Sequence, residues 1–169
     1  MKKLGVTLMS TLCLLTIFSL SHAQKKASPA ATAEGTIGGV NVKIDYHQPS
    51  AKGRKVMGEL VPYDKVWRTG ANNATTIELS DDLKIEGKTL AKGKYALFTI
   101  PGEKEWVIII NKNAKQWGAY DYKEADDVLR VSVKPTKAKS FVETFKIEVL
   151  ADGVNMEWEN TAVKFGLSK

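Results

Sequence analysis

Hydrophobic and polar residues alternate along several short stretches of the chain. Residues 40–46 read VNVKIDY, and residues 141–150 alternate in the same way. A period of two places successive side chains on opposite faces of a strand, so each stretch predicts a strand with one buried face. Residues 106–110 are apolar throughout. That pattern is typical of a strand inside a sheet with both faces covered.

Other strands are predicted between residues that favour turns. Gly38-Gly39, Pro101-Gly102 and Asp152-Gly153 are typical of tight turns and hairpins. The remaining predicted strands cover residues 75–79, 83–86, 88–90, 95–100, 105–111, 128–133, 154–158 and 162–167. No long segment has the period of an amphipathic helix. About nine or ten short strands therefore predict an all-β fold, an antiparallel β-sandwich or jelly-roll-like single domain.

The start of the chain has the features of a secretory signal peptide. A basic beginning precedes an apolar run, residues 4–20, and Ser21-His22-Ala23 fits a cleavage site before Gln24. We expect a signal peptide over residues 1–23, a flexible tether over 24–34 and one β-sandwich domain over 35–169. Cleavage would leave a periplasmic or secreted protein with no membrane span; a retained anchor is the alternative.

The cysteine content and the distribution of charge argue against several classes of function. The single cysteine, Cys13, lies inside the predicted signal peptide. The mature chain would then have no disulfide, no thiol nucleophile and no thiolate metal ligand. The net charge is +6, or +4 without Lys2 and Lys3. Because the excess charge is lysine dispersed along the chain and not a basic stripe, nucleic-acid binding is not expected.

One stretch, residues 61–73 (VPYDKVWRTGANN), has neither strand nor helix periodicity. Trp67 offers a flat apolar face, and Arg68 a planar fork of donors that suits carboxylate or phosphate. Only three of the 25 basic residues are arginine, so the chain uses lysine where a solvated charge suffices. We therefore place the candidate ligand site at this stretch. The alternative is that its polar side chains only brace a loop.

Aromatic rings and planar donors elsewhere are candidates to join this site. Flat rings stack on sugar faces, while asparagine and arginine fix hydroxyl or carboxylate groups. The candidate ligand-binding residues are Tyr63, Trp67, Arg68, Asn72 and Asn73, together with His47, Arg54, Lys94 and Trp117. We expect them to bind a small polar or anionic ligand, such as a glycan fragment.

The residue sets of common catalytic and metal sites are missing from the sequence. After signal cleavage His47 is the only histidine, and the acidic residues within 121–127 do not have EF-hand spacing, so no metal or cofactor is expected. No Gly-x-Ser-x-Gly motif and no phosphate-binding glycine loop occur. Two further hypotheses stay open: a carboxylate-dependent hydrolase acting on glycans, and a structural or interaction module of the cell envelope. Carboxylates available to a hydrolase include Glu59, Asp64, Glu103, Glu105 and Asp127.

Several short motifs together resemble one protein family. Gly53-Arg54, residues 58–63 (GELVPY), residues 67–72 (WRTGAN), Gly93-Lys94-Tyr95, Ile100-Pro101-Gly102 and Trp117-Gly118 resemble the DUF2911 family. The resemblance covers nearly all of the mature chain, and WRTGAN is its most specific part. It implies a small exported β-rich domain, chiefly of Bacteroidetes-type bacteria. Because the family has no known function, the resemblance implies no activity and no catalytic residue.

Overall fold

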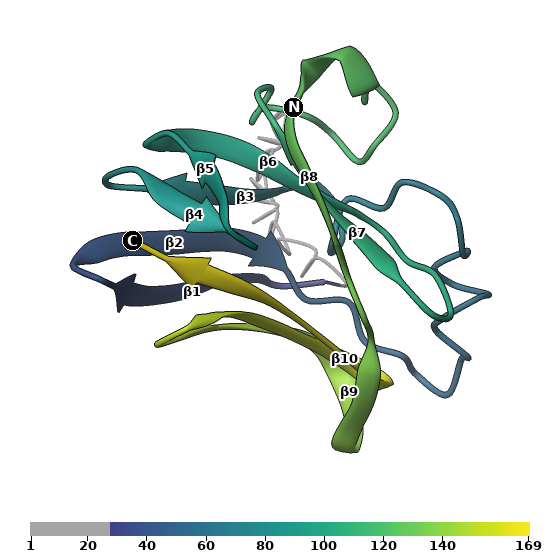
Figure 1. The fold of residues 1–169 in the computed structure, drawn as a ribbon. Helices are drawn as coiled ribbons and strands as arrows, with labels where there is room; N and C mark the ends of the chain where they lie inside the picture. Colours follow the sequence, from purple (N-terminus) through teal and green to yellow (C-terminus); the bar gives the residue numbers. More distant parts are fainter. Residues whose placement is uncertain (1–27) are drawn as a thin grey trace, which may run out of the picture.

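The fold is a sandwich of two antiparallel sheets, seen in a computed structural model that describes residues 28–169 (Figure 1). One sheet has six strands in the order β1-β2-β3-β6-β7-β8, and the other has four in the order β5-β4-β10-β9. The all-β prediction is confirmed. The predictions for residues 1–23 and for 24–27 lie outside the described residues. In the described part, no helix is long or apolar enough to cross a membrane.

Most of the predicted strands occur, with some changes in their bounds. The six-stranded sheet contains β1 (Ala30–Ile37), β2 (Val40–His47), β3 (Thr75–Leu79), β6 (Gly93–Ile100), β7 (Trp106–Asn111) and β8 (Asp127–Val133). The four-stranded sheet contains β4 (Leu83–Ile85), β5 (Lys88–Leu90), β9 (Thr136–Leu150) and β10 (Gly153–Ser168). A short 3-10 turn, η1 (Glu124–Asp126), precedes β8.

Strand β1 corrects the predicted tether, which was wrong from residue 30 onward. Ala30 pairs with His47 and Ile37 with Val40, so β1 forms an edge of the six-stranded sheet. The small residues of this segment resemble a linker in composition. Strand pairing uses the backbone, however, and Ala33 and Ile37 need only fill the inner face, where both are buried.

The two predicted strands 154–158 and 162–167 are one strand, β10, which pairs with β9. The pairing shifts register on both sides of Glu159, and Glu159 itself has a φ of 56°. An irregularity of this kind keeps a strand continuous while increasing its local twist. In Figure 1 most of the long β9–β10 hairpin lies at the bottom of the view, and the end of β10 rises to the C-terminus at the level of β2.

Two apolar clusters hold the molecule together. The larger lies between the sheets and includes the fully buried side chains of Ile44, Phe145 and Trp158. The smaller lies on the outer face of the six-stranded sheet, where Phe98 and Ile109 pack with Tyr122 of the β7–β8 connection. This outer cluster explains why residues 106–110 are apolar on both faces. The outer cluster does not cover the outer face of β2 and β3, where Asp45 and Thr76 line a hollow.

Candidate ligand-binding site

Trp67 anchors the irregular stretch to the core. Its backbone pairs with Thr99 of β6, with N–H···O distances of 2.7 and 3.0 Å. The indole Nε1 donates to the Gly70 carbonyl at 3.1 Å, and the ring stacks on Trp158 at a centroid distance of 6.0 Å. With only 8% of its surface exposed, Trp67 offers a ligand no open ring face.

The turn that follows is pressed against the end of β2. Thr69 has a φ of 54° and Gly70 a φ of 154°, and the Thr75 hydroxyl donates to the Thr69 carbonyl at 2.6 Å. A Cβ at Gly70 would lie 2.9 Å from the His47 carbonyl oxygen. Glycine is therefore required here, and its close approach brings the 70–73 segment beside His47.

Arg68 is a half-buried cation with one donor, Nε, that no described residue satisfies. Its Nε is enclosed and has no hydrogen-bond partner in the described chain. The side chain lines a hollow of about 310 Å³, which we call the Arg68 hollow, together with Lys52 and Arg54. None of the described residues that line it is acidic. The hollow is therefore electropositive.

Arg54 is held at this hollow by its own loop. Its Nε donates to the Ala51 carbonyl at 2.9 Å, and its Nη2 donates to the Ser50 carbonyl at 2.8 Å. These bonds fix the guanidinium plane without neutralising its charge. Arg54 is thus a brace for the loop and a source of positive potential in the hollow.

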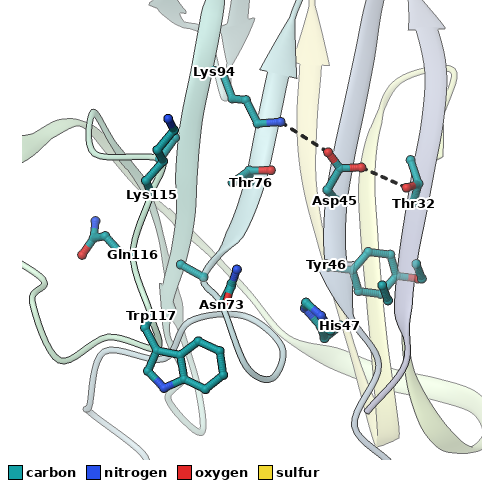
Figure 2. Close-up of a pocket in the computed structure, with 14 residues that line it drawn as sticks. Thr32, Asp45, Tyr46, His47, Asn73, Thr76, Lys94, Lys115, Gln116 and Trp117 are labelled. Carbon is teal, nitrogen blue, oxygen red and sulfur yellow. Dashed lines mark hydrogen bonds and ion pairs between the residues drawn. The ribbon is translucent and has the colours of Figure 1, made fainter. Parts of the chain in front are cut away.

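A second, wider hollow of about 570 Å³ lies over the outer face of β2 and β3, and we call it the Trp117 hollow (Figure 2). It brings together four candidate residues, His47, Asn73, Lys94 and Trp117. Thr32, Asp45, Thr76, Lys115 and Gln116 also line it.

The charged groups of the Trp117 hollow compensate one another. Lys94 Nζ lies 3.4 Å from Asp45 and 3.4 Å from Glu78, and the Thr32 hydroxyl donates to Asp45 at 2.9 Å (Figure 2). Burial disfavours the Asp45 carboxylate, but the hydrogen bonds from Thr32 and Lys94 outweigh it and lower its pKa below 3.8. Burial likewise opposes the Lys94 charge, but bonds to Asp45 and Glu78 raise its pKa above 10.5. Both groups are therefore charged at neutral pH.

Trp117 is exposed but held in place by its backbone neighbours. The Ala74 N–H donates to the Gln116 carbonyl and the Gly118 N–H to the Asn72 carbonyl, each at 3.0 Å. The buried Gln116 amide donates to Asn111 Oδ1 at 3.1 Å and to the Asn113 carbonyl at 2.7 Å. The indole nevertheless keeps 57% of its surface exposed.

Arg68 lies between the two hollows. While its side chain lines the Arg68 hollow, its Nη1 is 3.8 Å from the position of a Cβ built on Gly118, next to Trp117. The Gly70–Asn73 segment and the chain from Ser28 to Ala30 contribute residues to both hollows. The Arg68 hollow and the Trp117 hollow therefore lie next to each other.

A family comparison gives the same family as the sequence motifs. The model of DUF2911, described as a protein of unknown function, matches residues 28–167. The chain belongs to the DUF2911 family. No curated protein and no solved structure matches it. The DUF2911 match covers both sheets and both hollows, so the candidate site lies wholly within the family domain.

Within this DUF2911 domain the predicted site residues do not form one cluster. Arg54, Trp67 and Arg68 line one hollow, whereas His47, Asn73, Lys94 and Trp117 line the other. Asn72 lines neither, and its amide donates to the Ser28 carbonyl at 3.3 Å. Tyr63 lies apart, near Gly102 at the β6–β7 turn.

Sequence reasoning missed Lys52 and Asp45 of the DUF2911 domain. Asp45 could have been predicted as a site residue, because the alternation in residues 40–46 places it on the same strand face as His47. No sequence pattern distinguishes Lys52, since lysines are frequent in this chain and the loop that contains Lys52 has no periodicity.

Three of the candidate carboxylates of the DUF2911 domain lie together at the β6–β7 turn. Asp64, Glu103 and Glu105 line a hollow of about 450 Å³ at the β6–β7 turn, but all three are exposed. No group of three His, Cys, Asp or Glu side chains in residues 28–169 is arranged to hold a metal ion.

Proposed function

We propose that this DUF2911 protein is an exported, non-catalytic β-sandwich that binds a small anionic ligand, such as an acidic glycan fragment, in the Arg68 hollow. The observation that carries the proposal is the group of three cations, Lys52, Arg54 and Arg68, on a hollow whose described lining has no acidic residue. Export rests on the predicted signal peptide over residues 1–23.

An unpaired buried donor is costly to the folded protein. Leaving such a group without a partner costs about 1–3 kcal/mol, and more on a charged side chain. A ligand oxyanion in the hollow would offset part of this cost by pairing with the Arg68 charge. The guanidinium fork matches the two oxygens of a carboxylate or phosphate, and Lys52 and Arg54 add positive potential.

The two other functions that the sequence left open, a structural role and a carboxylate-dependent hydrolase, have less support. A purely structural role is favoured for Arg54 and Asn72, which donate to backbone carbonyls, but Arg68 Nε has no such bond in the described residues. A carboxylate-dependent hydrolase needs two carboxyl groups across a cleft. The described walls of the Arg68 hollow contain none.

The test is calorimetric titration of phosphate, citrate and glucuronate into the mature chain at constant ionic strength. Arg68→Gln removes the charge and the fork, and Arg68→Lys removes the fork alone. Lys104→Gln is the control, because it removes one positive charge from a different hollow. We expect Arg68→Gln to abolish binding, Arg68→Lys to weaken it about tenfold and Lys104→Gln to leave it unchanged.

Thermal unfolding provides an independent measurement. A ligand at a concentration 100 times its Kd stabilises the folded chain by about 2.7 kcal/mol, so the unfolding temperature should rise for the unsubstituted protein and not for Arg68→Gln. The proposal is wrong if none of the three anions binds. It is also wrong if Arg68→Gln and Lys104→Gln bind equally well.

Export has its own measurement. Mass spectrometry of the protein recovered from the periplasm or the medium should find a mature chain that begins at Gln24. Recovery of the full-length chain in the cytoplasm alone would contradict export without bearing on the Arg68 hollow.

A further inference from the structure

The Trp117 hollow differs in chemistry from the Arg68 hollow. The pairing of Lys94 with Asp45 and Glu78 leaves that lysine little attraction for an anion, and the other groups on the hollow are mostly neutral donors and acceptors. We propose that the Trp117 hollow is a second binding site, for an uncharged sugar ring that stacks on the indole of Trp117.

The first support is the state of the indole itself. Large aromatic side chains are normally buried, and Trp67, Trp106 and Trp158 are. Trp117 is instead 57% exposed, although hydrogen bonds on both sides hold its backbone. Because the backbone is already ordered, only the side-chain torsions of Trp117 lose freedom when a ligand stacks on the indole.

The second support is the arrangement of polar groups around the ring. Figure 2 shows Asn73 and His47 near the indole, with Thr76, Asp45 and Lys94 farther along the same hollow. A pyranose has C–H groups on its faces and hydroxyl groups around its edge. The Trp117 face suits the former, while carboxylate, amide and hydroxyl groups suit the latter.

Two of the polar groups, Asp45 and Lys94, are already held by other residues. Asp45 accepts from Thr32 and Lys94, yet a carboxylate has acceptor sites for about four hydrogen bonds, so it can still accept from a sugar hydroxyl. The Lys94 ammonium donates to Asp45 and lies within ion-pair distance of Glu78. Lys115 is the further cation on the hollow and is exposed to solvent. The hollow, at about 570 Å³, is within the usual size range of small-molecule sites.

The test is an NMR titration of the mature chain, following the indole N–H signal of Trp117. The probes are glucose, galactose, mannose, N-acetylglucosamine, cellobiose and maltose. We expect at least one to shift this signal in a saturable manner. Trp117→Ala should weaken binding of that sugar about tenfold or more, as measured by calorimetry.

Two control variants test whether sugar binding belongs to the Trp117 hollow. Tyr120→Ala removes an aromatic ring that is 82% exposed and lies outside the hollow, so sugar binding should not change. Lys52→Gln changes the Arg68 hollow and lies outside the Trp117 hollow, so it should also leave sugar binding unchanged, which distinguishes the two sites. The proposal is overturned if none of the six sugars shifts the Trp117 signal, or if Trp117→Ala binds as tightly as the unsubstituted protein.

Discussion

Tryptophan has two opposite roles in this molecule, and they can be compared directly. Trp67 is enclosed by Trp106, Phe145 and Trp158, and its Nε1 donates to the Gly70 carbonyl. Trp117 faces solvent on a braced loop. The same substitution at the two positions should therefore have very different costs.

We expect Trp67→Phe to lower the free energy of unfolding by about 2 kcal/mol or more, because it leaves a cavity and an unpaired Gly70 carbonyl. Trp117→Phe should change it by less than about 0.5 kcal/mol, as usual for exposed positions. Urea unfolding of both variants measures the difference. Equal costs would contradict the placement of Trp67 in the core.

Gly70 is the second residue whose role can be isolated. Gly70→Ala places a Cβ 2.9 Å from the His47 carbonyl oxygen and 3.1 Å from Thr75 Oγ1, in addition to an unfavourable φ. Gly87→Ala has the unfavourable φ of 79° but meets no atom within 4 Å. We expect about 1–2 kcal/mol of destabilisation at Gly87 and more at Gly70, measured by thermal unfolding. A smaller loss at Gly70 would show that the turn is not pressed against β2.

At the scale of elements, the connection between β7 and β8 is pinned at its end by a polar network. The Tyr122 hydroxyl donates to Asp127 at 2.5 Å, and Arg130 Nε donates to the same carboxylate at 2.7 Å. Asn111 adds a bond of 2.8 Å to the other carboxylate oxygen. This network fixes the covering segment over Phe98 and Ile109, and so one wall of the Trp117 hollow.

The network predicts a dependence of stability on alkaline pH. Burial, followed by the hydrogen bond to Asp127, raises the pKa of Tyr122 from 10.0 to about 12. Because the folded-state pKa is the higher one, the contribution of Tyr122 is complete below pH 10 and is lost as the pH rises toward 12.

The measurement compares the unsubstituted protein with Tyr122→Phe across this range. The stability advantage of the tyrosine over the phenylalanine should shrink as the pH rises, since phenylalanine does not titrate. Taking the difference cancels the titration of the other tyrosines and the lysines. A constant difference from pH 9 to 12 would contradict the assignment.

At the scale of the whole molecule, β1 is part of the domain and not a linker. A chain that begins at Ser28 should fold like the longer one. A chain that begins at Gly38 should lose at least about 2 kcal/mol, the value of burying one side chain such as Ile37, and should expose β2 as a new edge. Circular dichroism melts and light scattering measure stability and association. Equal melting temperatures would mean that β1 does not contribute to the fold.

The sequence predicted the sandwich because alternation and turn residues report directly on strands. It failed for β1, whose small residues pair through their backbone, and for β10, because it could not show that one strand continues through the irregular Glu159. Seven of the nine candidate residues line two neighbouring hollows. Their division into two hollows depends on which strands are neighbours, since His47 and Lys94 are brought together only by the order β2-β3-β6.

The small outer cluster gives the β7–β8 connection an apolar contact of its own, separate from the one between the sheets. A segment packed in this way can open locally while the rest of the protein stays folded. Amide hydrogens over residues 112–126 should therefore exchange with solvent sooner than those of β3. Between these events the Tyr122 network holds the wall that carries Trp117, so the hollow keeps one shape in the closed protein even though this wall is less stable than the core.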